Sequence, residues 1–283
     1  MTLNEAFRKG IEILKNAGIE APAGDAGVLL CSVIHCDRAF LYAHSTDEVE
    51  QILLENYFSM LERRAGGMPL QYLTGKQEFM SLPFEVGSGV LVPRQDTELL
   101  VETVIKLCKE KGEGQQILDI GTGSGCIAVS LAYYIPQCRV TAIDKMVDAI
   151  AIAQRNAQTN RMTDRIRFIK SNLFDEIAGE KFDVIVSNPP YIRTDDIEGL
   201  QREVRYHEPM EALDGGLDGL YFYRRIIHEA PEFLEADGVL AFETGYDQAA
   251  DVALLMVNDF SHIKIYKDLA GTDRVVLGRK RRA

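Results

Sequence analysis

An apolar run that ends in two consecutive prolines carries the clearest chemical signal in the sequence. Val184, Ile185 and Val186 are β-branched and uncharged, which predicts a strand buried on both faces of a parallel sheet. Asn188-Pro189-Pro190-Tyr191 follows, and because proline has no N–H to donate, the strand must end at Asn188. In open α/β sheets, ligands bind at the carboxyl ends of the strands.

These four residues have the chemistry to hold a planar –NH2 group. The Asn188 side-chain oxygen and the Pro189 carbonyl are two acceptors that can take both hydrogens of an amide or amino nitrogen. Tyr191 can stack on the flat group from one side. Because Pro-Pro is also common at turns, a rigid strand end beside a core tyrosine is an equally good interpretation of these residues alone.

A glycine-rich loop earlier in the chain predicts a second ligand. Gly121-Thr122-Gly123-Ser124-Gly125 lies between a predicted strand and a predicted helix, where glycines let the backbone approach a ligand and the helix offers free N–H groups. Asp144 ends the next strand about 20 residues later, where an acid typically accepts hydrogen bonds from ribose hydroxyls. Cys126 stands where the dinucleotide motif has its last glycine, which favours an adenosyl ligand other than NAD, and S-adenosylmethionine fits.

Two further observations bear on this nucleoside site. Asn172-Leu173 closes the following strand, so an amide can meet the edge of an adenine and an apolar side chain its face. Asp144 has a structural alternative, because it also precedes a helix predicted to begin at Val147 and can cap that helix. The joint occurrence of the loop and the acid favours ligand binding over capping.

Alternating strands and helices after residue 116 predict the scaffold that positions these groups. Such alternation implies βαβ units and a mostly parallel sheet, hence an α/β fold. A helix over 98–109 precedes it, with Asp96 or Thr97 as its predicted cap. The predicted strands are 117–120, 139–143, 166–169, 182–187, 239–243, 263–266 and 274–277, and the helices between them are 126–134, 147–160, 220–234 and 248–257.

The chain before this scaffold predicts a separate helical bundle. Apolar residues recur at helical spacing over 3–17, 26–35 and 49–64, and Gly66-Gly67-Met68-Pro69 marks a boundary. Short extended runs on either side of Gly87-Ser88-Gly89 predict a β-hairpin. The predicted organisation is therefore a helical domain over 1–70, a hairpin linker over 71–92 and a catalytic domain over 93–283.

Composition narrows the classes of function. The net charge of −12 argues against a protein that grips duplex nucleic acid over a broad basic face, and the basic cluster at 279–282 is interpreted as a solvated tail. No apolar run approaches roughly eighteen residues, and the first residues lack an apolar signal core, so a cytoplasmic location is expected. The five cysteines lack paired spacing, which predicts reduced thiols and no metal site.

These motifs together resemble a known group of enzymes. The glycine loop, Asp144 and Asn188–Tyr191 resemble class I S-adenosylmethionine-dependent methyltransferases, which have a Rossmann-like fold. The stretches 69–75, 91–98, 186–192 and 267–274 are similar to the HemK/PrmC family, the peptide chain release factor glutamine N5-methyltransferases. The resemblance covers both domains. Gln95-Asp96 stands where the family often has Pro-Glu, and Asn172 where Asp is common.

The resemblance implies an activity and a role for each motif. The enzyme would transfer a methyl group from S-adenosylmethionine to N5 of the glutamine in the Gly-Gly-Gln (GGQ) motif of release factors, leaving S-adenosylhomocysteine. Gly121–Gly125 would bind the methionine part of the cofactor, Asp144 its ribose, and Asn172 and Leu173 its adenine, with Asn188 beside it. Asn188–Tyr191 would hold the glutamine, and the helical domain would help dock the release factor. A monomer is expected.

No catalytic base is predicted for such a reaction. The excess proton on an amide nitrogen becomes acidic once the new bond has formed, so a strong base is not needed beforehand. His207 and Glu208 follow the motif and invite the alternative of a base, but a surface loop is the favoured interpretation.

Three rival functions share some of these features. A DNA adenine N6-methyltransferase and a ribosomal-RNA guanine N2-methyltransferase use a similar motif, but the net charge argues against both, and a DNA enzyme must also extract a base. A non-catalytic cofactor-binding module is the third alternative. The presence of Asn188 and Tyr191 argues against it.

Overall fold

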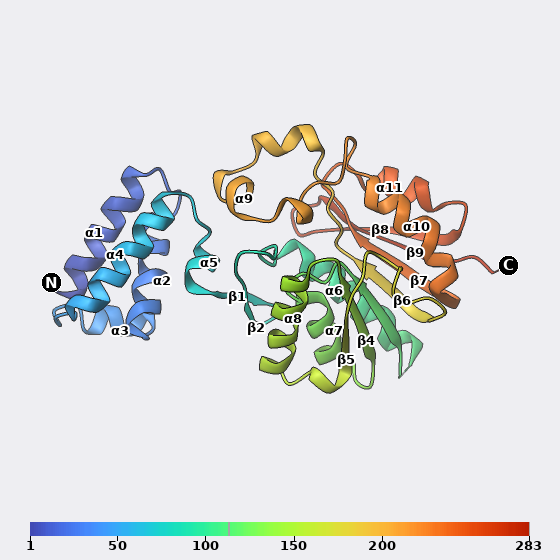
Figure 1. The fold of residues 1–283 in the computed structure, drawn as a ribbon, viewed down its shortest axis with the longest axis horizontal. Coiled ribbons are helices and arrows are strands. Elements are labelled where there is room, and N and C mark those ends of the chain that lie inside the picture. Colours follow the sequence, from blue (N-terminus) through green and yellow to red (C-terminus); the bar gives the residue numbers. More distant parts are fainter. Residues whose placement is uncertain (113, 283) are drawn as a thin grey trace. The chain divides into compact units, whose positions relative to one another are not determined.

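The computed structural model describes residues 1–112 and 114–282, and the chain divides into two units (Figure 1). The first, here called the helical unit, comprises Met1–Lys76 and Gln201–His207. The second, here called the sheet unit, comprises Gln77–Leu200 and Glu208–Ala283. The chain therefore leaves the sheet unit once, for one short segment, and returns to it.

The helical unit packs around one apolar core. Its helices are α1 (Leu3–Asn16), α2 (Pro22–Ile34), α3 (Arg38–Ala43), α4 (Gln51–Ala65), α5 (Leu70–Thr74) and, from later in the chain, α9 (Arg202–His207). Tyr57 is fully buried and donates its hydroxyl to the Ala26 carbonyl at 3.2 Å. Gly10 lies against that hydroxyl, where a methyl group would overlap it, so a glycine within α1 makes room for Tyr57.

The sheet unit is built on seven strands in the order β5-β4-β3-β6-β7-β9-β8. Neighbouring strands from β5 to β7 are parallel, and β9 is antiparallel to both β7 and β8. The direction of strand order reverses between β3 and β6, the position at which open α/β sheets bind ligands. The strands are β3 (Gln116–Ile120), β4 (Arg139–Asp144), β5 (Ile166–Lys170), β6 (Phe182–Ser187), β7 (Leu234–Glu243), β8 (Phe260–Lys267) and β9 (Asp273–Lys280).

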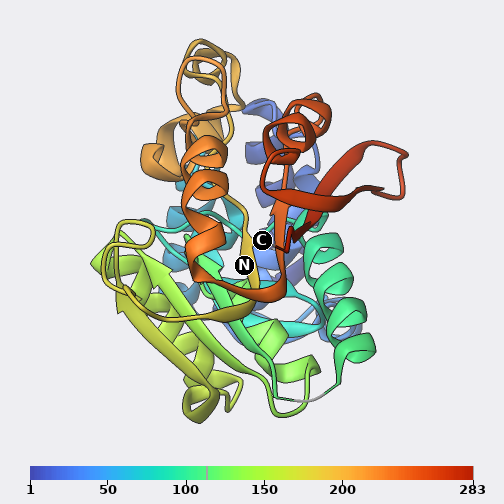
Figure 2. The same cartoon turned by 90° about the vertical axis from the view of Figure 1, so that its right-hand side faces the viewer.

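Helices cover both faces of this sheet. One core contains α6 (Asp96–Lys111), α7 (Cys126–Tyr134) and α8 (Val147–Thr159), and the other contains α10 (Tyr221–Phe233) and α11 (Ala249–Met256). Val184 belongs to the first core and Ile185 to the second, because successive strand residues point to opposite faces. Figure 2 shows α10, in orange, in front of the strands. The prediction that β6 is buried on both faces is confirmed.

The predicted hairpin is present but its position was wrong. Its strands are β1 (Lys76–Phe79) and β2 (Leu82–Glu85), so the turn is Met80-Ser81 and not Gly87–Gly89. Both turn residues have positive φ, 51° and 57°, as a tight two-residue hairpin turn requires. Residues 90–92 form no strand, although they were predicted to pair.

Three other local predictions need correction. Residues 71–74 fall within the predicted hairpin linker but belong to the helix α5, and α3 was not predicted at all. Neither Asp96 nor Thr97 caps α6, because the helix already includes both and its N-cap position is Gln95.

No helix in the described part of the chain combines the length and the apolar character needed to cross a membrane.

Candidate active site

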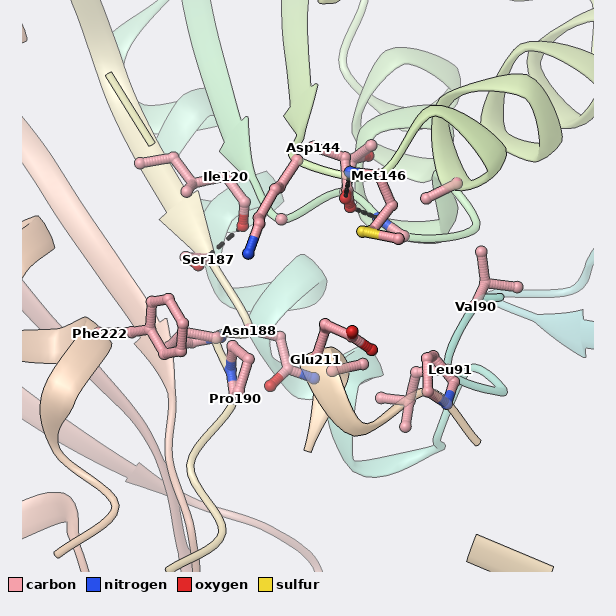
Figure 3. A pocket seen from close by; sticks show the side chains of 18 of the residues that line it. Val90, Leu91, Ile120, Asp144, Met146, Ser187, Asn188, Pro190, Glu211 and Phe222 are labelled. Carbon is pink, nitrogen blue, oxygen red and sulfur yellow. Dashed lines mark hydrogen bonds between the residues drawn. The ribbon is translucent and has the colours of Figure 1, made fainter. Parts of the chain in front are cut away.

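A cavity of about 700 Å³ opens at the carboxyl ends of β3, β4 and β6, where the strand order reverses. Ser187 at the end of β6 donates its hydroxyl to the Ile120 carbonyl of β3 at 2.8 Å, which ties the two strand ends together (Figure 3). Of the residues predicted to form a site, ten line this cavity: Gly121, Thr122, Gly123, Ser124, Asp144, Asn172, Leu173, Asn188, Pro189 and Pro190.

The glycine loop adopts a conformation that other residues rarely reach. Gly121, Gly123 and Gly125 have φ of 73°, 55° and 79°. Gly125 does not line the cavity, although it was predicted to bind the cofactor. It lies at the start of α7, and a Cβ placed there would lie 2.9 Å from the Cβ of Ala153 in α8. Its evident role is to allow α7 and α8 to pack closely.

A buried carboxylate supports the loop from beneath. Asp119 lies inside β3 with no exposed surface, and the Thr122 hydroxyl donates to its Oδ2 at 2.7 Å. Burial raises the pKa of Asp119 to about 7, although the bond from Thr122 acts in the opposite direction. This residue was not predicted as part of the site. The signal that could have revealed it is a charged residue within an otherwise apolar strand.

Asp144 joins the loop to the start of α8. Its Oδ2 accepts from the Gly123 N–H at 2.8 Å and its Oδ1 from the Met146 N–H at 2.9 Å (Figure 3). Burial raises its pKa, and these backbone N–H groups act against that rise. Asp144 is not the N-cap of α8, since that position is Met146. Each carboxylate oxygen keeps a second lone pair with which it can accept a hydroxyl hydrogen.

Asn188 and Pro189 offer two acceptors that the described protein leaves without donors. Asn188 donates its Nδ2 to the Thr97 hydroxyl at 3.2 Å, and no described residue donates to its Oδ1. Likewise, no described N–H group donates to the Pro189 carbonyl. Asn188 and Pro190 extend from the end of β6 into the cavity (Figure 3). A planar –NH2 group is the ligand that two such acceptors suit best.

Tyr191 is held outside this lining. Gln248 donates its Nε2 to the Tyr191 carbonyl at 2.9 Å, and Gly215 packs so closely that a Cβ there would lie 2.7 Å from the Tyr191 Cα. The Tyr191 ring packs against the core that contains α10 and α11. The predicted stacking of this ring on a ligand stays a prediction.

Two family models match the sequence in separate stretches. Residues 94–203 match the methyltransferase small domain, and residues 5–75 match the PrmC N-terminal domain. A release factor glutamine methyltransferase from Clostridium botulinum is 40% identical over 99% of this chain and 100% of its own length. The corresponding Moorella thermoacetica protein is 41% identical, with 99% of each chain covered.

The chain belongs to the release factor glutamine methyltransferase family. The family predicted from the sequence motifs is thereby confirmed. A solved methyltransferase from Pyrococcus furiosus, 20% identical, matches 71% of this chain and 90% of its own with a TM-score of 0.52. That likeness concerns the fold alone, and the predicted Rossmann-like methyltransferase fold is confirmed.

Several residues of this methyltransferase line the cavity without having been predicted to bind a ligand. They come from the segment before α6, from the first turn of α6, from α8 and its preceding turn, from the segment before α10, and from α10 itself. They include Val90, Leu91, Pro93, Arg94, Thr97, Met146, Ala149, Pro209, Met210, Glu211, Tyr221, Phe222 and Arg225. Residues 91–94 belong to a stretch that resembles the family, and that resemblance was the available signal.

Glu208 corrects another expectation. It was interpreted as part of a surface loop, but its side chain is 1% exposed and pairs with the cavity-lining Arg94 at 2.6 Å. The pair fixes the segment that returns from the helical unit against the segment before α6.

Within the described residues, no group of three or more His, Cys, Asp or Glu side chains is arranged to hold a metal ion.

Proposed function

We propose that this enzyme methylates N5 of the glutamine in the GGQ motif of peptide chain release factors, using S-adenosylmethionine. The observation that carries the proposal is the pair of free acceptors, Asn188 Oδ1 and the Pro189 carbonyl, in the same cavity as the glycine loop and Asp144. One acceptor for each amide hydrogen distinguishes a primary amide from a hydroxyl or a thiol, which has a single hydrogen to donate.

The residues around the loop fit the cofactor. The cavity volume lies within the range of about 300–1,000 Å³ that is usual for small-molecule sites. The loop backbone from Gly121 to Ser124 would face the methionine part, Asp144 the ribose, and Asn172 with Leu173 the adenine. When bound, S-adenosylmethionine supplies an electrophilic methyl group on a sulfonium, and S-adenosylhomocysteine is the product.

The protein's own contribution is made at the nucleophile. An amide nitrogen is nearly non-basic because its lone pair is delocalised into the carbonyl group. Hydrogen bonds from its two N–H groups to Asn188 Oδ1 and the Pro189 carbonyl increase the electron density on nitrogen and fix its direction. As the nitrogen–carbon bond forms and the sulfur–carbon bond breaks, the excess proton on nitrogen becomes acidic and leaves to solvent. No histidine is required.

The partner assignment rests on the helical unit and on the relatives. Residues 5–75 match the PrmC N-terminal domain, and the full-length relatives are named for release factors. We assign docking of the release factor to the helical unit and methyl transfer to the sheet unit. The net charge of −12 argues against nucleic acid as the substrate. The cytoplasmic location and the monomeric state stay predictions.

The substrate class is tested by methyl transfer to competing acceptors. The enzyme is incubated with methyl-labelled S-adenosylmethionine and, separately, with purified release factor, duplex DNA and ribosomal RNA. We expect label on the release factor alone, mapped by mass spectrometry to the GGQ glutamine. Label on nucleic acid would overturn the substrate assignment, and cofactor binding without any transfer would favour a binding module.

A further inference from the structure

A fully buried carboxylate lies beside the residue that holds the substrate amide. Glu243 ends β7 and is 1% exposed. Its neighbour Phe242 pairs in register with Ser187, so Glu243 lies next to Asn188 across the strand ends. The side chains of Thr97 and Asn188 lie beside the Glu243 carboxyl group and can donate to it, and its buried Oε2 has no hydrogen-bond partner among the described residues. The mechanism above assigns this group no role, yet burying a carboxylate is costly.

These contacts determine the direction of each hydrogen bond. An ionised carboxylate can only accept, so the single Thr97 hydroxyl hydrogen points to Glu243. The Thr97 oxygen is then an acceptor, and Asn188 must offer it Nδ2–H, which it does at 3.2 Å. The Asn188 oxygen is thereby turned away from this cluster.

We propose that Glu243 is a positioning residue, which acts with Thr97 to orient the Asn188 amide so that its oxygen faces the substrate. Without Glu243 the Thr97 hydroxyl is free to donate to Asn188, and the Asn188 side chain can turn over. Its –NH2 group would then face the –NH2 group of the glutamine, placing donor against donor. The inference rests on the proposed function, because it concerns how that glutamine is held.

The groups around Glu243 shift its pKa into the pH range in which the enzyme can be assayed. Burial raises its pKa to about 7, while hydrogen bonding from Thr97 and the charge of Arg274 act to lower it. Arg274 is itself paired with Asp96 at 3.0 Å and Asp268 at 3.2 Å. The titratable and charged groups that interact with Glu243 are Asp96 of α6, Cys126 of α7, Tyr191 after β6, Tyr223 of α10 and Arg274 of β9.

The test compares variants of Glu243 and Thr97 in the full chain. Glu243→Met keeps the volume but loses the acceptor, and Glu243→Gln keeps an acceptor oxygen. For Glu243→Met we expect kcat for methylation of release factor to fall about 100-fold. KM for release factor and Kd for S-adenosylmethionine should change by less than about threefold. The kcat of Glu243→Gln should be at least about tenfold higher than that of Glu243→Met, because glutamine keeps an oxygen that can accept the Thr97 hydroxyl hydrogen.

Thr97 supplies an independent pair of variants. Thr97→Ser keeps the hydroxyl and should retain kcat, whereas Thr97→Val keeps the shape and should lower kcat with Kd for the cofactor unchanged. Asp183→Asn is the control, because Asp183 is the second residue of β6, at the opposite end from the cavity, and accepts a hydrogen bond from the Gln116 N–H. It should leave kcat at the wild-type value.

The pH profile separates positioning from a merely structural role. Below about pH 7 Glu243 carries a proton and can donate, so kcat should rise with pH through about 7, and this rise should be absent in Glu243→Gln. An active Glu243→Met enzyme, or an equal loss of kcat and cofactor binding, would overturn the proposal. Failure of the wild-type enzyme to methylate glutamine at all would instead refute the proposed function.

Discussion

At the scale of single residues, the site divides into groups that hold the cofactor and groups that hold the acceptor nitrogen. The cofactor side is a backbone loop fixed by a carboxylate, since both Asp144 oxygens accept backbone N–H groups. The acceptor side is the end of β6, whose two free acceptors have no other described use. Mutations in the first group should therefore weaken cofactor binding, whereas mutations in the second should lower the rate of methyl transfer.

Asp144→Asn tests the cofactor side. An asparagine keeps one oxygen but places an –NH2 group opposite Gly123 or Met146, so both the loop and the ribose contact should weaken. We expect Kd for S-adenosylmethionine to rise at least about tenfold, measured by isothermal titration calorimetry. At saturating cofactor, kcat should stay within about threefold of wild type.

The matched control for that variant is Asp148→Asn. Asp148 is an exposed acid in the first turn of α8 and does not line the cavity. It carries the same change of charge without the loop contacts. Unaltered cofactor affinity in Asp144→Asn would contradict the assignment of the ribose.

At the scale of elements, periodicity predicted the sheet unit well and the turns poorly. The limits of β6 and α7 agree with the predicted ranges, because a β-branched run or a continuous apolar helix defines its own ends. The hairpin was misplaced because Met80-Ser81 adopts left-handed conformations without glycine or asparagine. The short helix α3 spans six residues, too few to show a period.

Close packing within the helical unit gives a prediction at this scale. Gly10→Ala should lower the free energy of unfolding by about 2 kcal/mol, because the new methyl group meets the Tyr57 ring and hydroxyl. In a Tyr57→Phe background the cost of Gly10→Ala should be smaller, by at least about 0.5 kcal/mol. The free energies of unfolding of the wild type, both single variants and the double variant, measured by denaturant unfolding, form a double-mutant cycle that gives this difference.

Gly24→Ala in α2 is the control for that cycle. A Cβ at Gly24 would lie 3.8 Å from the Cβ of Ala21, an ordinary van der Waals contact, so alanine there should be neutral or stabilising by up to about 1 kcal/mol. Additive effects of Gly10→Ala and Tyr57→Phe would show that the predicted overlap is absent.

At the scale of the whole molecule, the chain passes through the helical unit between two parts of the cavity. Asn188 to Pro190 line the cavity, the chain then contributes α9 to the helical unit, and Pro209 to Ala212 line the cavity again. Within the helical unit, Arg64 binds Asp25 at 2.7 Å and Glu203 of α9 at 2.5 Å. One guanidinium therefore anchors the segment that connects the two cavity walls.

Arg64→Met tests this connection. Losing the guanidinium leaves two carboxylates unpaired, one of them in a largely buried position, and should destabilise the protein by about 2 kcal/mol. We expect kcat/KM for release factor to fall about tenfold or more, while Kd for S-adenosylmethionine is unchanged. Wild-type kinetics with release factor would show that the anchoring of α9 has no part in substrate handling.

Contacts of this kind could not be predicted from the sequence. Arg94 and Glu208 are 114 residues apart, and Arg64 and Glu203 are 139 apart, and no local pattern marks either pair. The local motifs, in contrast, predicted the ten cavity-lining residues, because glycine permits positive φ in a tight loop and proline ends a strand. The proximity of Glu243 to Asn188 could not be predicted either, because it depends on the register of β6 and β7.

The central claim is that Asn188 and the Pro189 carbonyl hold both hydrogens of a glutamine amide during methyl transfer. Its most direct test is Asn188→Ala, with the rate of GGQ methylation and the Kd for S-adenosylmethionine measured on one preparation. We predict that kcat falls at least about 100-fold while Kd stays within about threefold of wild type. An undiminished rate, or parallel loss of rate and cofactor affinity, would contradict the account.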